Sequence, residues 1–197
     1  PTIVNCSFET NQGGGIAIED GDPTLIGCLF FKNTGTALTC TRSRPTIIDS
    51  TFYGNFDQGM LGIESDAILF GCTFSTNAAF IGGGLQNIDS DPILVDCLFE
   101  GNNGYTAGAG IHNTRSSPVL FGCTFEDNYG DFGCGLHNVE GSRPRLEDCV
   151  LTGNAADVDG GGVWSDTDSR AIILGSTLCD NTPNQISGPW EDLGGNT

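Results

Sequence analysis

Positive charge is the scarcest property of this 197-residue chain. Seven lysines and arginines stand against 25 aspartates and glutamates, which gives a formal net charge of −18 at pH 7 and a sequence pI near 4.1. A chain this acidic repels phosphate groups. Nucleic acids and anionic membrane surfaces are therefore not expected as partners.

Long apolar runs and metal-type cysteine spacings are missing too. No stretch approaches the ~18 apolar residues of a transmembrane helix. Nine cysteines occur, but none in a C-x-x-C motif, so we expect no zinc or iron–sulfur site. The 30 glycines argue against a mostly helical protein, because each glycine costs a helix interior about 1 kcal/mol.

What the sequence does contain is a repeat with steps of 22, 22, 22, 25, 26, 26 and 27 residues. The repeat predicts eight coils, which begin at Pro1, Pro23, Pro45, Ala67, Pro92, Pro118, Pro144 and Ala171. Because the chain starts without methionine and within this pattern, we expect it to be part of a longer chain.

Three positions near the start of each coil predict side chains that point into the interior. The third residue is always Leu or Ile, the sixth is Cys or Ser, and the eighth is Phe or Leu. The sixth and eighth residues share one face of a strand. A further strand is predicted in the glycine-rich half of the coil, with its inward anchors at Ile16, Leu38, Leu61, Leu85, Ile111, Leu136 and Val163.

Two other columns predict the corners. The fifth residue alternates between Asn or Asp and Gly, the residue types that tolerate positive φ, which indicates a left-handed corner. The eleventh residue is Asn in all eight coils, which predicts a ladder of stacked side-chain amides. Six of the cysteines fill one interior column that also accepts Ser50 and Ser176, so we interpret them as buried reduced thiols.

Stacked coils with three short strands each would form parallel sheets with strands ~4.8 Å apart. A leucine-rich repeat is the competing architecture, because the spacing from Leu25 to Asn33 fits its consensus. That fold needs a helix or turn segment in the other half of each repeat. Runs such as Gly13-Gly14-Gly15 and Gly82-Gly83-Gly84 favour a strand there instead.

The alternation of F-x-x-N, as in Phe52-Tyr53-Gly54-Asn55, with G-G-x-[ILV] resembles the repeats of the pectin-lyase-like superfamily, especially those of polymorphic-membrane-protein-type surface proteins. The resemblance implies an all-β, right-handed, single-stranded parallel β-helix of about eight coils over residues 1–181. Residues 182–197 would then be a C-terminal cap, with Trp190 and Leu193 over the last coil. Relatives include adhesins, surface and matrix proteins and polysaccharide lyases and hydrolases, so we expect an extracellular or cell-surface location.

The first strand of each coil predicts an apolar outer face. Arg145 and Glu147 mark the outward positions of this strand in the seventh coil. In the fourth to sixth coils these outward positions hold six large apolar side chains. An apolar block of this size suggests an interface, unless a loop or a further domain covers it or the register of the strand is different. The candidate residues for docking a protein partner or a larger assembly are Ile68, Phe70, Ile93, Val95, Val119 and Phe121.

A second candidate surface is a ligand strip on the glycine-rich strand, one residue after each apolar anchor. The column reads Ala17, Thr39, Gly62, Gln86, His112, His137 and Trp164, and the last four residues form the candidate strip. An exposed Trp is a natural platform for a sugar. The plainer interpretation is a mixed, solvated strand.

Catalysis is not expected on this strip. The resemblance implies that lyases of this fold use an Arg or Lys base with an acidic calcium cluster, and no basic residue stands here. Hydrolysis would need two carboxylates roughly 5 to 10 Å apart. Asp131 and Asp159 would meet that condition only through their loop conformations, so no catalytic residue is predicted.

The acidic residues divide into two groups. Those in the turns before each coil alternate with bases and predict surface ion pairs such as Asp89, Arg115 and Glu140. Asp131, Asp157 and Asp159 lie in a loop that lengthens from the fourth coil onward. They are weak Ca²⁺ candidates, and the alternative is a solvated acidic face.

These observations lead to two functional hypotheses. The first is a non-catalytic structural or interaction module that docks a protein partner through the apolar first-strand face. The alternative is a carbohydrate-binding or polysaccharide-cleaving protein that works along Gln86, His112, His137 and Trp164.

Overall fold

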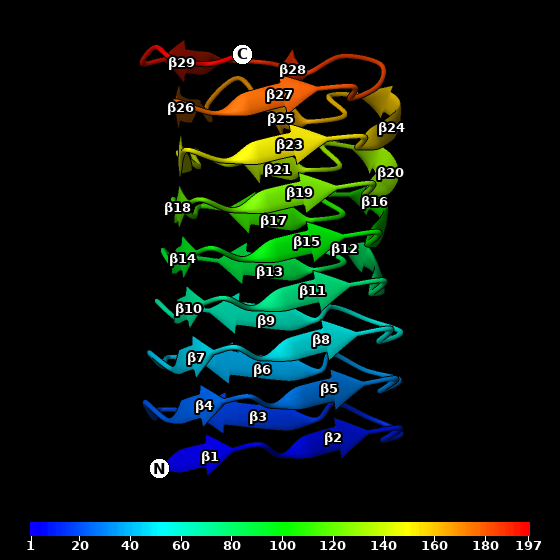
Figure 1. Ribbon diagram of the computed structural model, residues 1–197, viewed down its shortest axis with the longest axis vertical. Coiled ribbons are helices and arrows are strands. Elements are labelled where there is room, and N and C mark those ends of the chain that lie inside the picture. Colours follow the sequence, from blue (N-terminus) through cyan, green and yellow to red (C-terminus); the bar gives the residue numbers. More distant parts are fainter.

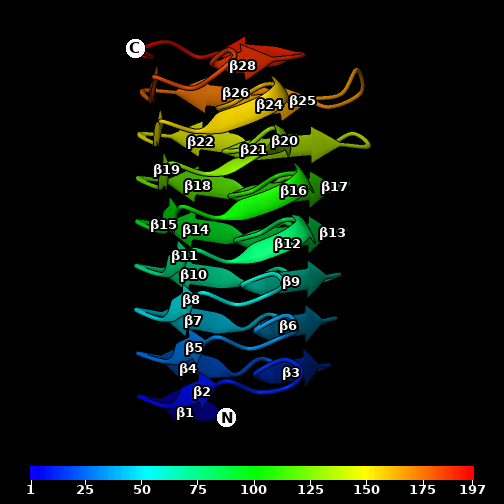
Figure 2. The same ribbon diagram turned by 90° about the vertical axis from the view of Figure 1, so that its right-hand side faces the viewer.

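The chain winds into a column of stacked coils. The computed structural model describes residues 1–197, contains strands and no helix, and places the two termini at opposite ends of the column (Figures 1 and 2). No helix of the kind that crosses a membrane is present. All strand pairs between successive coils are parallel, as the repeat predicts.

The first sheet has nine strands and holds the start of every coil. Its strands are β1 (Thr2–Val4), β4 (Thr24–Ile26), β7 (Thr46–Ile48), β10 (Ile68–Phe70), β14 (Ile93–Val95), β18 (Val119–Phe121), β22 (Arg145–Glu147), β26 (Ala171–Leu174) and β29 (Trp190–Asp192).

The second sheet has eight strands and follows the first after one tight corner. Its strands are β2 (Ser7–Glu9), β5 (Leu29–Phe31), β8 (Thr51–Tyr53), β11 (Thr73–Ser75), β15 (Leu98–Glu100), β19 (Thr124–Glu126), β23 (Val150–Thr152) and β27 (Thr177–Cys179).

The third sheet also has eight strands and contains the glycine-rich half of each coil. Its strands are β3 (Ile16–Glu19), β6 (Leu38–Thr41), β9 (Met60–Ile63), β13 (Leu85–Ile88), β17 (Ile111–Thr114), β21 (Leu136–Val139), β25 (Val163–Ser165) and β28 (Ile186–Ser187).

A fourth sheet of four strands corrects the prediction of three strands per coil. It occupies the corner between the second and third sheets in the fourth to seventh coils only. The residues expected to form a longer loop pair with one another instead, because each coil supplies a short extended segment at the same height. The strands are β12 (Ala78–Ile81), β16 (Asn103–Ala107), β20 (Tyr129–Phe132) and β24 (Ala155–Asp159).

The interior is built from stacked like residues. Phe30, Phe52, Phe74, Phe99 and Phe125 are fully buried, and successive rings lie parallel with centroids 4.5–4.8 Å apart. The expected cysteine column is buried from Cys28 to Cys149 and all nine thiols are free. These columns confirm the inward positions predicted near the start of each coil.

One inward anchor was predicted one residue out of register. Met60, not Leu61, pairs with Leu38 and Leu85, and it is fully buried. Leu61 takes the outward position and Gly62 faces inward. Because Met60 and Leu61 are both apolar, the alternation of apolar and polar residues did not show which of them faces inward.

The asparagine ladder is confirmed and explains the second corner. Asn102 is fully buried; its Nδ2 donates to the Phe74 carbonyl at 2.9 Å and to Asn128 Oδ1 at 3.0 Å. Its Oδ1 accepts from the backbone N–H of Asn77 at 3.1 Å. Each amide therefore satisfies the corner backbone of two coils, which buried polar groups require.

Most coils turn through at least three left-handed positions, where the sequence predicts one. The predicted corner is left-handed in all eight coils, from Asn5 to Gly175. Lys32 and Arg42 also adopt positive φ, at 51° and 47°, in the second and third corners. Such a conformation is uncommon for residues with a Cβ, so the sequence carried no sign of it.

The alternation at the predicted corner has a packing cause. A Cβ on Gly71 would lie 2.6 Å from Asp49 Oδ1, and one on Gly122 would lie 2.5 Å from Asp96 Oδ1. The side chain of each corner Asp occupies the space that the next coil must leave empty. Asp and Gly therefore alternate along this edge.

Residues 182–197 form one more turn of the column. β28 and β29 extend the third and first sheets beyond the last coil, with Trp190 paired to Ala171, and Trp190 and Leu193 are 41% and 42% exposed. Polar groups take over the column positions instead. Asn196 Oδ1 accepts from the Ser176 N–H at 2.8 Å, and Gln185 Oε1 accepts from Asn181 Nδ2 at 2.5 Å.

Candidate functional site

The corner between the third and first sheets carries the predicted ion pairs. Arg115 donates to Asp89 at 2.6 Å and contacts Glu140, so the three residues form a ladder across three coils. Arg42 pairs with two acids of the preceding coil, Asp20 at 2.9 Å and Glu19 at 2.5 Å. These contacts lower the pKa of Asp20 and Asp89 below the usual value for an aspartate.

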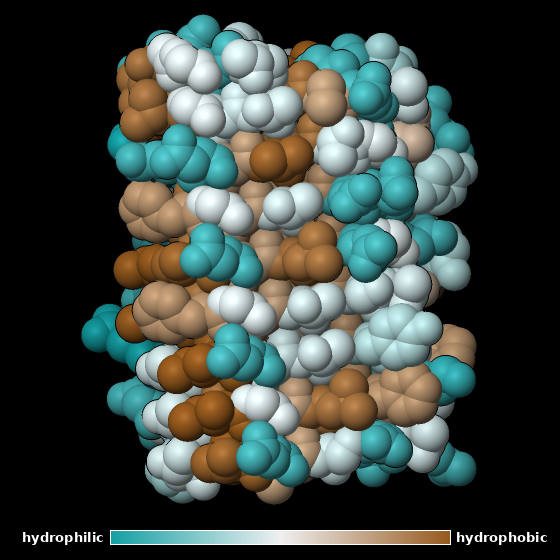
Figure 3. All heavy atoms as spheres, viewed as in Figure 1, coloured by the Kyte–Doolittle hydropathy of each residue, from teal (hydrophilic) through white to brown (hydrophobic).

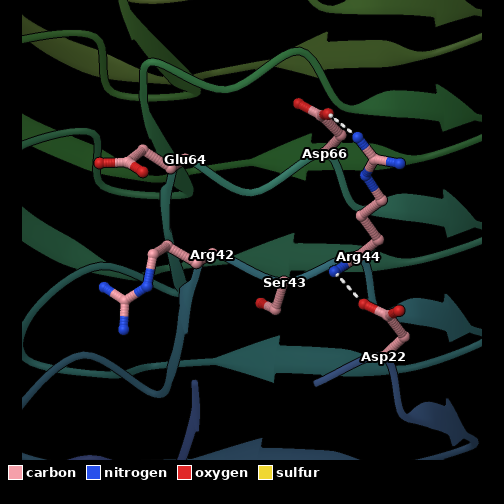
Figure 4. Close-up of a pocket in the computed structure, with 6 residues that line it drawn as sticks. All are labelled: Asp22, Arg42, Ser43, Arg44, Glu64 and Asp66. Atoms are coloured by element: carbon pink, nitrogen blue, oxygen red, sulfur yellow. Dashed lines mark hydrogen bonds and ion pairs between the residues drawn. The ribbon is translucent and has the colours of Figure 1, made fainter. Parts of the chain in front are cut away.

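The same corner holds a shallow, fully polar pocket that is lined by Asp22, Arg42, Ser43, Arg44, Glu64 and Asp66 (Figure 4). Arg44 donates through its backbone N–H to Asp22 at 2.7 Å and through Nη2 to Asp66 at 3.4 Å. Both arginines of the pocket already have carboxylate partners. The pocket is therefore an ion-paired surface, not an anion site.

The ligand strip is assembled as predicted but is not open. The rings of His112 and His137 stack with centroids 4.9 Å apart, and Trp164 stacks on His137 at 4.6 Å. Gln86, in the preceding coil, pairs with His112. Because the rings lie face to face, they present edges to solvent rather than a row of free faces.

Burial of the two histidines comes from the turns that leave the fourth sheet. Gly108 and Gly133 adopt positive φ, and a Cβ on either would come within 2.8 Å of the strip histidine in its own coil. His112 and His137 are only 6% and 8% exposed as a result. The sequence predicts an exposed strand here, because it gives no sign that these turns fold over the two histidines.

The electrostatics of the strip follow from this burial. Loss of hydration lowers the pKa of His112 to about 4 and that of His137 to about 3. His112 Nε2 lies 3.0 Å from Thr114 Oγ1, while Nδ1 of both rings has no hydrogen-bond partner. Both imidazoles are therefore neutral at pH 7, so the strip carries no charged acid or base from its histidines.

The predicted interface residues lie together on the outside of the first sheet. β10, β14 and β18 pair in register, so Ile68, Ile93 and Val119 form one column and Phe70, Val95 and Phe121 the next. Phe70, Ile93 and Phe121 are 41%, 40% and 38% exposed, and the other three are half-buried. In Figure 3, apolar side chains gather along the left side of the view, over the strands of the first sheet.

No other segment of the chain covers this face. Arg145 and Glu147 of β22 continue the two columns and close the apolar block with an ion pair at 3.0 Å. The outward orientation that was inferred from these two residues is the one the structure has.

The three calcium candidates do not form one cluster. Asp131 and Asp157 lie on the outer face of the fourth sheet, where Asp157 accepts from the Tyr129 hydroxyl at 2.5 Å. Asp159 instead accepts from Ser187 at 2.5 Å and Asn184 at 2.8 Å, which lowers its pKa. No group of three or more His, Cys, Asp or Glu side chains is placed to hold a metal ion.

Exposed aromatic residues on the fourth sheet were missed by the sequence reasoning. Phe80 and Tyr105 project from β12 and β16 with 77% and 54% exposure. The signal was the three or four extra residues between the ladder Asn and the inward anchor in these coils. In the two coils with an exposed ring, a small residue, Ala79 or Gly104, directly precedes the aromatic one.

The architecture defines the chain as a parallel β-solenoid, and the comparison with known families gives its class. The sequence model described as "Right handed beta helix region" matches residues 1–154. The chain belongs to this family, in agreement with the resemblance to the pectin-lyase-like superfamily. No curated protein matches the chain.

Proposed function

We propose that the chain is a rigid, non-catalytic interaction scaffold that docks a protein partner or a larger assembly through the apolar face of the first sheet. One observation carries this proposal: β10, β14 and β18 present six large apolar side chains as a continuous, uncovered block. Contiguous apolar patches of a few hundred Å² mark interaction surfaces on soluble proteins.

The rigidity of the face supports docking. β14 lies between β10 and β18, and its backbone pairs with both in unbroken register. A surface held in this way loses little conformational freedom when it binds, which lowers the cost of association. We place the protein outside the cell or on its surface, as the resemblance to surface repeat proteins suggests.

The test replaces two exposed rings of the face by charge in the full chain. Phe70→Glu with Phe121→Glu should abolish cross-linking to a partner from a photoreactive residue at position 93, in extracts of the organism that makes the protein. Tyr53→Glu with Val150→Glu is the matched control, because both residues are exposed and apolar but lie on the second sheet.

The control variant should cross-link like the unmodified chain. Circular dichroism melts establish that both variants fold. Unchanged cross-linking of the Phe70 and Phe121 variant, with the fold intact, contradicts the proposal.

Carbohydrate binding is the second candidate, and the stacked rings of His112, His137 and Trp164 are the observation that favours it. Trp164 is half-buried at the upper end of the stack. Affinity electrophoresis in gels that contain soluble polysaccharides tests this function. Retardation that is lost in Trp164→Ala supports it, and retardation that is equal in both proteins excludes the strip as the binding surface.

A further inference from the structure

The outer face of the fourth sheet combines aromatic rings with carboxylates. Ala79, Gly104, Gly130 and Ala156 pair across the four strands, and register shifts follow them in the outer two strand pairs. The residue after each is exposed, or half-buried in the case of Asp131: Phe80, Tyr105, Asp131 and Asp157. The fourth and fifth coils thus contribute an aromatic ring each, and the sixth and seventh coils contribute a carboxylate each. We call these four residues the aromatic–acidic column.

The rings of this column do not serve the core. The paired residues that face the interior are small, and a Cβ on Gly130 would meet the Gly104 carbonyl at 2.1 Å. Phe80 and Tyr105 contact each other with centroids 6.0 Å apart and planes tilted by 59°. Two large, mostly exposed rings in contact on one strand pair form a small aromatic patch, which points to a role at the surface.

The strands of the fourth sheet carry negative charge and no positive charge. β12, β16, β20 and β24 contain no lysine or arginine. A hydrogen bond to Asp157, with the fields of Asp157 and Asp131, raises the pKa of Tyr129. The fourth sheet is thus an aromatic surface in a negative field.

We propose that the aromatic–acidic column binds a cationic protein segment rich in arginine or lysine. A guanidinium or ammonium group is attracted to the face of an aromatic ring, and the next basic side chain along the segment reaches a carboxylate. Strands in successive coils lie ~4.8 Å apart, so an extended segment running along the column meets both kinds of group.

A basic segment fits this surface better than a glycan does. The tilted rings of Phe80 and Tyr105 form a corner instead of the flat platform on which a sugar ring stacks. The net charge of −18 steers cations toward the molecule and leaves neutral sugars unaffected. The column lies on the opposite side of the molecule from the first sheet, so this proposal does not depend on the docking face (Figure 1).

The test measures binding of fluorescein-labelled deca-arginine to the full chain by fluorescence anisotropy at about 0.15 M salt. Phe80→Leu with Tyr105→Leu keeps apolar bulk but removes the rings, and we expect affinity to fall about tenfold. Asp131→Asn with Asp157→Asn should weaken binding to a similar extent.

Two controls separate the column from the general acidity of the chain. Glu100→Gln with Glu126→Gln removes two exposed acids from the second sheet, and Tyr53→Leu removes an exposed ring there. Both should change the affinity less than twofold. Equal losses in the glutamate control and the aspartate variant would overturn the proposal, because binding would then reflect net charge alone.

Two further outcomes overturn it as well. One is an unchanged affinity for deca-arginine in the Phe80 and Tyr105 variant. The other is loss of binding to a soluble polysaccharide in that variant while deca-arginine still binds, which would make the column a glycan surface. Melting curves of each variant confirm that the fold is retained.

Discussion

At the scale of single residues, His112 and His137 show how position in the coil sets chemistry. They stand on outward positions of the third sheet, yet the glycine turns beside them remove nearly all of their contact with water. A buried imidazole resists protonation, so the folded state holds both rings neutral. Their contribution to stability therefore depends on pH.

We expect the free energy of unfolding to fall as the pH is lowered from 7 to about 5. Unfolding returns each imidazole to its ordinary pKa of about 6.5, so the unfolded chain binds more protons across this range. Stability is fully present above about pH 6.5 and is lost progressively toward the folded pKa values of about 4 and 3. Between pH 7 and about pH 5 the loss for the pair amounts to roughly 3–4 kcal/mol.

Urea titrations at several pH values measure this loss. His112→Gln with His137→Gln should flatten the dependence between pH 7 and about 5, since Gln86 already occupies the same column. A dependence that is equally steep in the double variant would assign it to carboxylates instead.

At the scale of elements, the corner between the first and second sheets is the most constrained part of the coil. Its glycines need positive φ, and half of the coils also place an Asn or Asp oxygen where a Cβ would stand. These are two separate costs. Alanine at Gly122 would incur both the left-handed strain and the clash with an Asp oxygen, whereas alanine at Gly101, in the next corner, would incur only the strain.

Gly122→Ala should destabilise the protein more than Gly101→Ala. Both residues have φ near 60°, so each alanine incurs about 1–2 kcal/mol of left-handed strain. A Cβ on Gly101 meets only the Thr76 methyl at 3.6 Å, whereas one on Gly122 meets Asp96 Oδ1 at 2.5 Å. We expect the Gly122 variant to lose about 1 kcal/mol more in thermal or urea unfolding.

Adding Asp96→Gly to Gly122→Ala should recover that difference. Equal losses for the two alanine variants would show that the close approach of Asp96 has no energetic weight.

The sequence predicts the elements where one residue type repeats at one spacing. The Phe, Cys and Asn columns fix the period, the interior and the ladder, because each type has a single role in the coil. The predictions were wrong or incomplete where one residue type can occupy more than one position of the coil. Met60 and Leu61 are both apolar, and only the constant distance from the ladder Asn to the anchor, five residues in Asn33 to Leu38, would have selected Met60.

Repeated residue types at a fixed spacing predict neither the fourth sheet nor the burial of the candidate strip. An insertion of three or four residues reads as a loop, since its strands form only by pairing with the same insertion in the next coil. The positive φ of Lys32, Arg42 and Arg115 is likewise imposed by the stack and not by those residues. The apolar face was predictable because a single charged pair, Arg145 and Glu147, revealed its orientation.

At the scale of the whole molecule, charge is separated by face. Five of the seven bases lie at the corner between the third and first sheets, where arginines bridge carboxylates of neighbouring coils. The remaining acids face few bases, and repulsion among them opposes the compact state.

We therefore expect the melting temperature to rise by a few degrees as sodium chloride is increased from about 0.01 to 0.15 M. Salt screens the long-range repulsion, and the exposed ion pairs that it also weakens contribute little each. Glu100→Gln with Glu126→Gln should reduce the slope. A melting temperature that falls with salt would mean that the arginine ladders outweigh the repulsion.

The Asp–Gly corner also limits how such a column can lengthen or shorten. A coil that carries Asp at its corner must be followed by one that carries Gly, so removal of the coil with Gly122 would bring Asp148 against Asp96. Removal of the coil with Asp96 leaves only glycines in contact. Copying an Asp coil together with the Gly coil that follows it therefore preserves every corner contact, whereas removing a Gly coil alone does not.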